Sequence, residues 1–412
     1  MKTKSLLRTL AAVTGLFVTF QSAPAQSWSL TSAPNSYWNS LASSADGTKL
    51  VAAGSGALFT STNSGVTWNS NQLHTIAGSY TCVASSADGT KLLVGTLSDV
   101  LYTSTNAGVT WVSNNVPVRT WTAVASSADG TKLLAGSSGP IYTSADAGAT
   151  WVAHQVPVTD ALPYFVWHGL ASSADGTRLA AAGWMPMSYG LGTRGGLIYT
   201  STNSGATWQP SGAPDTNWCS IACSADGTRL IAGAYEDMYG LYNGAIFTST
   251  NSGAAWRMVD APETRNVQNQ ISVACSADGA RMVAAVNGFS YPGIIFISTD
   301  SGLTWSSNSS PVSSWSAVAS SADGGKLAAA VYGGPIYTLQ TILQPSLSIT
   351  PRGGDLLLSW IIPSSDFVLQ QKPDLSTTNW TEVGAVPTLT NLEQRVTTSM
   401  SPGQGYYRLK SR

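Results

Sequence analysis

The sequence predicts an all-β protein, a seven-bladed β-propeller closed by an N-terminal strand and followed by a small β-sandwich. Three observations predict it. A motif built around Ala-Asp-Gly recurs seven times, and a second motif that ends in Thr-Trp or Ala-Trp recurs six times. The start of the chain also matches the piece that the seventh repeat lacks, so the repeats are expected to close into a ring.

The first motif, clearest at 42–50 as Ala-Ser-Ser-Ala-Asp-Gly-Thr-Lys-Leu, predicts a tight turn in every repeat. Its aspartates are Asp46, Asp88, Asp129, Asp175, Asp226, Asp278 and Asp323. Asp-Gly between two apolar runs favours a hairpin, because Gly tolerates positive φ and Asp can bond its own turn. A unit of four short strands every 41 to 52 residues is typical of propeller blades.

The second motif reads Ser-x-Asp/Asn-x-Gly-x-Thr-Trp, with Ala replacing Thr in one copy. Its copies are Ser61–Trp68, Ser104–Trp111, Ser144–Trp151, Ser201–Trp208, Ser249–Trp256 and Ser298–Trp305. It resembles the Asp-box, or bacterial neuraminidase repeat, of sialidases, xyloglucan-cleaving endoglucanases, sortilin-type receptors and a photosystem II assembly factor. The resemblance implies a hairpin between the third and fourth strands of a blade, with the Trp wedged between blades. Because four copies have Asn for Asp, we expect these boxes to be structural and not catalytic.

The two ends of the repeat array predict how the ring closes. The seventh unit continues from its third strand into Leu339-Gln340 without a box. The N-terminal residues 27–30, Ser-Trp-Ser-Leu, match residues 304–307, Thr-Trp-Ser-Ser, of the sixth box. We therefore expect the N-terminus to supply the fourth strand of blade seven, which leaves no open sheet edge between the first and last blades.

The flanking segments have separate predicted roles. Residues 1–25 combine basic residues, an apolar run and Ala-Pro-Ala, which is typical of a secretory signal peptide, so we expect an exported, extracellular or periplasmic protein. The propeller is predicted at 26–341 and a linker at 342–345. Residues 346–412 resemble a fibronectin-III or immunoglobulin-like module through Leu358-Ser-Trp360, Val368–Gln371 and Tyr406–Leu409. Cys82, Cys219, Cys223 and Cys275 are expected to be unpaired core residues, although export permits disulfides.

Composition narrows the partners. Only 10% of the residues are charged, and the net charge is −1, which argues against nucleic acid as the partner. No later apolar segment is long enough to span a membrane. The three histidines and four cysteines lack metal-binding spacing, so neither a metal nor a cofactor is expected. We expect a monomer.

Variable loops indicate where a site lies. The turns that carry the two motifs keep their length, whereas the connections between the second and third strands are long in blades four to six, at 184–197, 235–245 and 287–294. Aromatic residues outside the repeat pattern gather there and could stack against sugar rings or grip an extended chain. The alternative is that they only pack the loops onto the scaffold. The predicted ligand-binding residues are Tyr164, Trp184, Tyr189, Arg194, Tyr235, Tyr239, Tyr242, Phe289 and Tyr291.

Loop carboxylates leave an enzymatic alternative open. Glycoside hydrolysis needs two carboxyl groups that converge on the scissile bond. The candidates in or near the enlarged loops are Asp160, Glu236, Asp237, Asp260 and Glu263, and the alternative is that they are solvated loop charges. The sequence thus favours non-catalytic binding of an extracellular glycan or other polymer, with a sialidase-like or endoglucanase-like hydrolase and a protein-assembly scaffold as alternatives.

Overall fold

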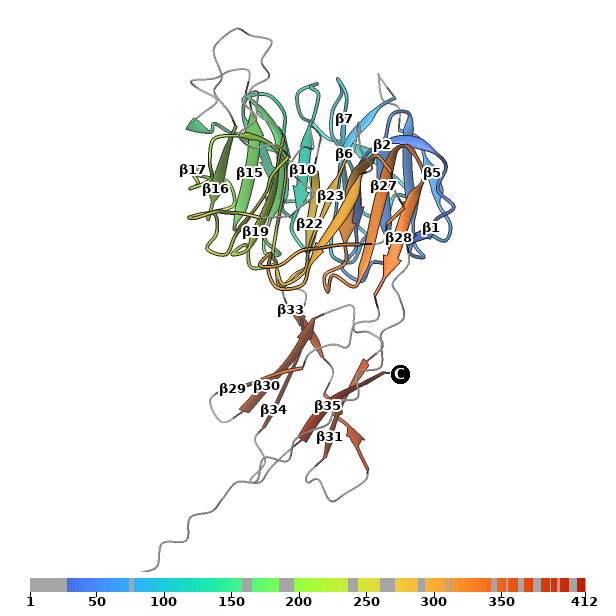
Figure 1. The fold of residues 1–412 in the computed structure, drawn as a ribbon, viewed down its shortest axis with the longest axis vertical. Coiled ribbons are helices and arrows are strands. Elements are labelled where there is room, and N and C mark those ends of the chain that lie inside the picture. Colours follow the sequence, from blue (N-terminus) through green and yellow to red (C-terminus); the bar gives the residue numbers. More distant parts are fainter. Residues whose placement is uncertain are drawn as a thin grey trace, which may run out of the picture.

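The chain is a seven-bladed β-propeller followed by a small β-sandwich (Figure 1). The structure, a computed structural model, describes residues 28–73, 78–157, 165–184, 196–235, 244–259, 271–287, 293–308, 310–311, 313–341, 347–352, 355–361, 367–372, 379–385, 387–390, 393–399 and 406–411. Each blade is an antiparallel sheet of four strands in chain order, with the first strand innermost and the fourth outermost.

The first four blades each contain four strands that are consecutive in the chain. Their strands are β2 (Ser36–Ser43), β3 (Leu50–Gly54), β4 (Ala57–Ser61) and β5 (Asn69–Asn71); β6 (Tyr80–Ser85), β7 (Leu92–Thr96), β8 (Tyr102–Ser104) and β9 (Val112–Ser113); β10 (Ala123–Ser126), β11 (Leu133–Gly136), β12 (Ile141–Ser144) and β13 (Val152–His154); β14 (Val166–Ser172), β15 (Leu179–Trp184), β16 (Leu197–Ser201) and β17 (Gln209–Pro210).

Blades five and six repeat this order, and blade seven borrows its outer strand. The strands are β18 (Asn217–Cys223), β19 (Leu230–Tyr235), β20 (Ile246–Ser249) and β21 (Arg257–Met258); β22 (Ile271–Cys275), β23 (Met282–Val286), β24 (Ile294–Ser298) and β25 (Ser306–Ser307); β26 (Trp315–Ser320), β27 (Lys326–Gly334), β28 (Ile336–Gln340) and β1 (Ser29–Leu30).

The N-terminal strand closes the ring as predicted. Strand β1 pairs with β28, with Ser29 opposite Thr338 and Leu30 opposite Tyr337, and Figure 1 shows the two side by side. Strand β27 also pairs with β2 through Tyr332 and Tyr37, which joins blades seven and one into one eight-stranded sheet.

The hydrophobic core lies between the blades. Among the described residues, seven apolar clusters each combine side chains of two neighbouring blades. The Trp that ends each copy of the second motif packs into the cluster that its blade shares with the preceding blade. Trp111 of blade two, for example, lies in the cluster between blades one and two. The inner-strand tryptophans are fully buried in the same clusters; they are Trp38, Trp121, Trp167, Trp218 and Trp315.

The box hairpins share one geometry whether they carry Asn or Asp. In blade two, the Ser104 hydroxyl donates to Asn106 Oδ1 (3.0 Å) and accepts the Gly108 N–H (3.0 Å). The Thr110 N–H donates to the same Asn106 oxygen (2.8 Å), and Trp111 Nε1 donates to the Gly108 carbonyl (3.0 Å). These polar groups are bonded inside the turn, as expected for a structural clamp, and Trp111 Nε1 also donates to Asn71 Oδ1 of blade one (3.4 Å).

The C-terminal strands form two sheets that face a small core. One sheet contains β29 (Ser348–Arg352), β30 (Asp355–Ile361), β34 (Glu393–Ser399) and β33 (Thr388–Thr390), and the other β32 (Thr381–Glu382), β31 (Phe367–Lys372) and β35 (Tyr406–Ser411). Leu358 and Trp360 from the first sheet pack with Leu369 from the second.

Candidate functional site

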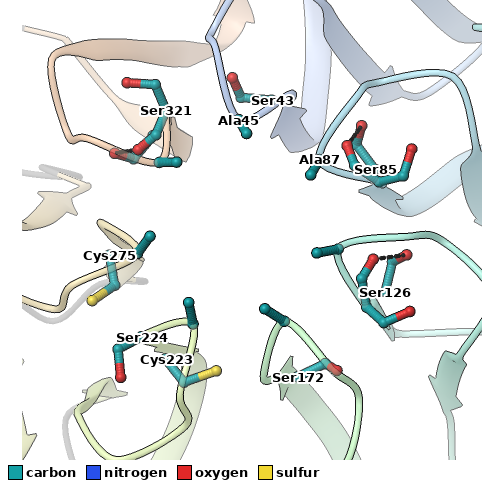
Figure 2. A pocket seen from close by; sticks show the side chains of 18 residues that line it. Ser43, Ala45, Ser85, Ala87, Ser126, Ser172, Cys223, Ser224, Cys275 and Ser321 are labelled. Carbon is teal, nitrogen blue, oxygen red and sulfur yellow. Dashed lines mark hydrogen bonds between the residues drawn. The ribbon is translucent and has the colours of Figure 1, made fainter. Parts of the chain in front are cut away.

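A central channel runs between the seven inner strands, and its two ends differ in build. The narrow end holds a cavity of about 160 Å³ lined only by Ser, Ala and Cys side chains of the inner strands and the Ala-Asp-Gly turns. In Figure 2, Ala45 and Ala87 point into this opening. Because similar small side chains repeat from blade to blade, they offer a ligand no specific contact that distinguishes one side of the opening from another. This end is therefore structural.

A closed ring of backbone hydrogen bonds surrounds the narrow end. The N–H of one turn alanine donates to the carbonyl of the equivalent alanine in the next blade, at 2.6–2.8 Å, all the way round. The alanines in ring order are Ala45, Ala87, Ala128, Ala174, Ala225, Ala277, Ala322 and again Ala45. Because the seventh bond returns to the first blade, no turn in the ring leaves its amide unbonded.

The basic residue of most repeats bonds a turn of the next blade. Lys49 Nζ donates to the Asp88 carbonyl (2.6 Å), and its stem lies so close that a Cβ on Gly89 would meet Lys49 Cβ at 2.8 Å. Gly89 also has φ +67, so both its backbone conformation and the lack of space for a Cβ require glycine there. Although burial raises the pKa of Asp88, hydrogen bonds from Ser86 and Thr90 lower it below its usual value. These charged groups serve the scaffold.

The wide end holds a cavity of about 700 Å³, which is within the range of ~300–1,000 Å³ typical of ligand sites. All seven inner strands line it, together with Trp184 at the end of β15 and Tyr332 in β27. This end lies on the face of the long loops, opposite the turns and boxes. Among the described lining residues there is no Asp, Glu, Lys or Arg.

One position of the inner strand sets the chemistry of this cavity. It directly follows the inner-strand aromatic residue, or its equivalent in blade six, and carries a different set of side chains around the ring: Asn39, Thr81, Thr122, His168, Cys219, Ile271 and Ser316. In five blades the strand register shifts here by one residue, which is a β-bulge. Bulges re-aim side chains and are frequent beside binding sites.

Most of these bulge-position groups are bonded to a neighbouring blade. Asn39 Nδ2 donates to the Tyr80 carbonyl (2.9 Å), the Thr122 hydroxyl to the Trp167 carbonyl (2.5 Å), and the Cys219 thiol to the Ile271 carbonyl (3.3 Å). His168 differs, since its Nε2 is buried and has no hydrogen-bond partner among the described residues. Blade four therefore presents the one imidazole of the cavity wall with an unused ring nitrogen.

His168 is held by Trp184. Their rings stack with centroids 5.2 Å apart and planes 19° from parallel. Burial in this uncharged wall lowers the pKa of His168 to about 4, so the imidazole is neutral at neutral pH and carries one N–H donor and one acceptor nitrogen. Trp184 itself is half-buried at the rim of the cavity.

A second aromatic pair stands at the same mouth. Tyr37 and Tyr332 are cross-strand partners at the junction of blades one and seven, with ring centroids 5.1 Å apart in an edge-to-face arrangement. Each is 55% exposed, unlike the repeat-position Tyr142, which is 8% exposed. Gly333, at φ +71, turns the chain directly against the Tyr37 ring.

The predicted site residues fall mostly outside the described part of the chain. All five carboxylate candidates, Asp160, Glu236, Asp237, Asp260 and Glu263, lie there, and so do Tyr164, Tyr189, Arg194, Tyr239, Tyr242, Phe289 and Tyr291. Tyr235 ends strand β19, and its side chain is likewise outside the described part. Trp184 is the predicted residue whose side chain the structure places, and it lies at the wide mouth as expected.

Sequence reasoning missed His168, Tyr37 and Tyr332. The two tyrosines carry a signal, because they also fall outside the repeat pattern, but they lie in blades one and seven, where the loops are short. His168 follows a repeat Trp directly, and only the alignment of the seven inner strands shows that this position varies while its neighbours do not.

The described residues contain no group of three or more His, Cys, Asp or Glu side chains arranged to hold a metal ion. They also contain no helix long and apolar enough to cross a membrane.

No protein-family model matches the chain, and no curated protein matches its sequence. Solved structures match its fold. YCF48 bound to D1 peptide superposes with a TM-score of 0.56 at 15% identity, covering 78% of this chain and 100% of that one. A GH74 xyloglucanase from Xanthomonas campestris has a TM-score of 0.57 at 15% identity, covering 82% and 59%.

Hydrazine synthase from Kuenenia stuttgartiensis has a TM-score of 0.59 at 14% identity, covering 77% of this chain and 98% of that one. The three names describe a peptide-bound protein, a xyloglucanase and a hydrazine synthase, which are unlike one another in function. At such identities the likeness shows the β-propeller fold and nothing finer.

Proposed function

We propose that this chain is an exported, non-catalytic recognition protein that binds a neutral extracellular glycan at the wide mouth of its propeller. The signal-like residues 1–25 support export. The hairpins that end in Trp have the turn bonding expected of Asp-boxes, and the C-terminal sheets fit a fibronectin-III-like module, so a modular exported protein is the natural class.

The observation that carries the proposal is the chemistry of the cavity around Trp184. A half-buried Trp stands at the rim of a space of about 700 Å³ whose described lining has hydroxyl, amide and imidazole groups but no charged side chain. Sugars stack their apolar faces on aromatic rings and bond their hydroxyls to neutral polar groups. A charged ligand would find no counter-ion among these residues.

Two alternatives have their own support. One solved structure of similar fold is YCF48 bound to D1 peptide, which favours a protein-assembly scaffold. Another is a GH74 xyloglucanase, and a hydrolase would draw its carboxylates from Asp160, Glu236, Asp237, Asp260 and Glu263. Against catalysis within the channel, the described lining offers no carboxyl pair.

A panel of soluble neutral polysaccharides, assayed for both binding and release of reducing ends, separates these functions. We expect the wild type to bind without releasing sugar. Trp184→Ala should weaken binding about tenfold, since an aromatic contact contributes about 1 kcal/mol or more. Leu303→Ala is the matched control, because Leu303 is 64% exposed at a box turn on the opposite face.

Each outcome bears on one class. Binding that survives in a folded Trp184→Ala variant contradicts the proposed site. Release of sugar by the wild type, lost in Asp237→Asn, would establish the hydrolase. Unfolding temperatures of all variants show whether a loss of binding reflects a loss of structure.

A further inference from the structure

Two aromatic pairs face each other across the wide mouth, and this follows from the order of the blades. Tyr37 and Tyr332 mark the junction of blades one and seven, while His168 and Trp184 belong to blade four. The ring of backbone bonds fixes the blade order, so blade four is three blades from each side of that junction. His168, Trp184 and Tyr332 line the same cavity, and Tyr37 packs against Tyr332.

We infer that a neutral oligosaccharide lies across this mouth, in contact with Trp184 on one side and the Tyr37–Tyr332 pair on the other, with a hydroxyl bonded to His168 Nε2. This inference rests on the proposed function and adds a second subsite, a span and a polar contact to it.

The exposure of the tyrosine pair supports a second subsite. The aromatic rings of the repeat pattern are buried: Tyr142, in the third strand of blade three, is 8% exposed and Tyr199, in that of blade four, is 6% exposed. Tyr37 and Tyr332 instead leave more than half of their surface to solvent beside an open cavity. Exposed, rigid aromatic rings at a cavity rim are typical of ligand contacts.

The unpaired nitrogen of His168 supports a polar contact between the two subsites. A buried polar atom without a partner costs free energy, and such atoms are uncommon in folded proteins. Because the surrounding wall is uncharged and keeps the ring neutral, Nε2 suits a hydroxyl group, which can donate or accept. A carboxylate or phosphate ligand would lack a charged partner at this wall.

Peptide binding by strand addition is disfavoured at the same place. That mode needs free backbone N–H and C=O groups on a sheet edge. The inner strands already direct theirs to neighbouring blades: the Val83 N–H donates to Ser40 Oγ (3.2 Å) and the Val318 N–H to Ser272 Oγ (3.0 Å). A stacked sugar ring does not need those groups.

The test compares short and long probes. Disaccharides and hexasaccharides of the cello-, xylo-, manno- and chito- series are titrated by calorimetry into the full chain and its variants. We expect a hexasaccharide to reach both aromatic pairs and a disaccharide only one. We therefore expect Tyr37→Ala and Tyr332→Ala to weaken hexasaccharide binding about tenfold and to leave disaccharide binding at the Trp184 side unchanged.

The controls keep structure and site apart. Tyr37→Phe retains the ring and should bind like the wild type, and Leu303→Ala should do the same. Because Tyr37 lies in β2 and Tyr332 in β27, each alanine variant is judged only if its unfolding temperature matches that of the wild type. If one variant fails this criterion, the other carries the test. His168→Phe keeps a ring against Trp184 but removes Nε2, so it should weaken both probes.

The outcomes separate this inference from the function on which it rests. If Trp184→Ala abolishes binding while the tyrosine variants bind like the wild type, the second subsite is wrong and the glycan site stands. If no oligosaccharide binds the wild type, the proposed function fails and the inference with it. A peptide selected from a displayed library that binds the wild type and not Tyr37→Ala, in the absence of sugar binding, would assign the mouth to a protein partner.

Discussion

At the scale of single residues, His168 shows how a repeat scaffold makes one position different. The six other blades fill the same position with groups that bond a neighbour or pack, whereas His168 Nε2 has no hydrogen-bond partner among the described residues and its ring is stacked on Trp184. Burial lowers the pKa of His168 to about 4. The same property that suits a hydroxyl ligand also makes the fold sensitive to acid.

The pH dependence of stability follows from this pKa. The pKa of histidine is near 6.5 in the unfolded state and about 4 for folded His168. Between these two pH values the unfolded state therefore binds a proton that the folded state does not bind. Stability is therefore complete above pH 6.5 and falls as the pH drops, by about 2 kcal/mol between pH 6.5 and 5. Chemical denaturation at a series of pH values measures it.

His168→Gln is the control for this prediction. Burial also lowers the pKa of His154, so some acid sensitivity should remain in the variant, but the slope should become clearly smaller. The turn aspartates do not interfere, because their lowered pKa values move their effect below pH 3.8. An identical slope in wild type and His168→Gln would show that His168 does not titrate as described.

Box residues allow a second test at this scale. Asn106→Asp should leave stability nearly unchanged, since Asp146 makes the equivalent bonds to Ser144 and Thr150 in the next blade. Asn106→Ala removes the acceptor for the Ser104 hydroxyl and the Thr110 N–H and should cost about 1 kcal/mol. Denaturant midpoints of both variants check this. Equal losses would mean that the carboxamide itself, and not its oxygen, is needed.

At the scale of elements, the closing strand is short yet carries a large side chain. Strand β1 has two residues, and the Trp28 that precedes it is buried between blades six and seven, 6.0 Å from the Trp315 ring. Trp28→Ala should therefore destabilise the protein by about 3 kcal/mol. Leu30→Ala, on the same strand but 64% exposed, should cost almost nothing. If neither variant lost stability, the strand would act through its backbone pairing with β28 alone.

The blades were predictable because all seven carry the Ala-Asp-Gly turn and six carry the second motif, and the closing strand because residues 27–30 match a box strand elsewhere. The proposed site was less predictable. Loop length pointed to the face of the wide cavity and to Trp184, but Tyr37 and Tyr332 meet only when the first and last blades join. That juxtaposition has no local signature, since the two residues are far apart in sequence and their loops are short.

At the scale of the whole molecule, the seven turns form one closed circuit. Each blade is tied to the next by a backbone bond between turn alanines, and most also by the Lys or Arg that reaches the next turn, as Lys91 reaches the Asp129 carbonyl (2.6 Å). Opening one interface frees neither neighbour, because each remains joined on its other side. We expect the propeller to unfold as one cooperative unit, despite its repeat construction.

Two of the four cysteines report on that cooperativity. All are free thiols: Cys82 lies in blade two, Cys219 and Cys223 in blade five, and Cys275 in blade six. Burial raises the pKa of Cys82 and Cys223 to about 12 and that of Cys219 to about 11, and Cys275 is also raised, so almost no thiolate exists at pH 8. Cys82 and Cys219 are buried, so in the folded protein they should react with a thiol reagent only when the structure opens, whereas Cys223 and Cys275 are partly exposed at the narrow end of the channel.

If opening is global, the buried thiols of Cys82 and Cys219 react at one rate, set by unfolding when the reagent is in excess. Trp28→Ala, although its site is in blade seven, should then accelerate both together, and Leu30→Ala should accelerate neither. Mass spectrometry of the quenched, digested protein follows each cysteine separately. A variant that speeds labelling of Cys219 in blade five while Cys82 in blade two keeps its wild-type rate would show that the ring opens blade by blade.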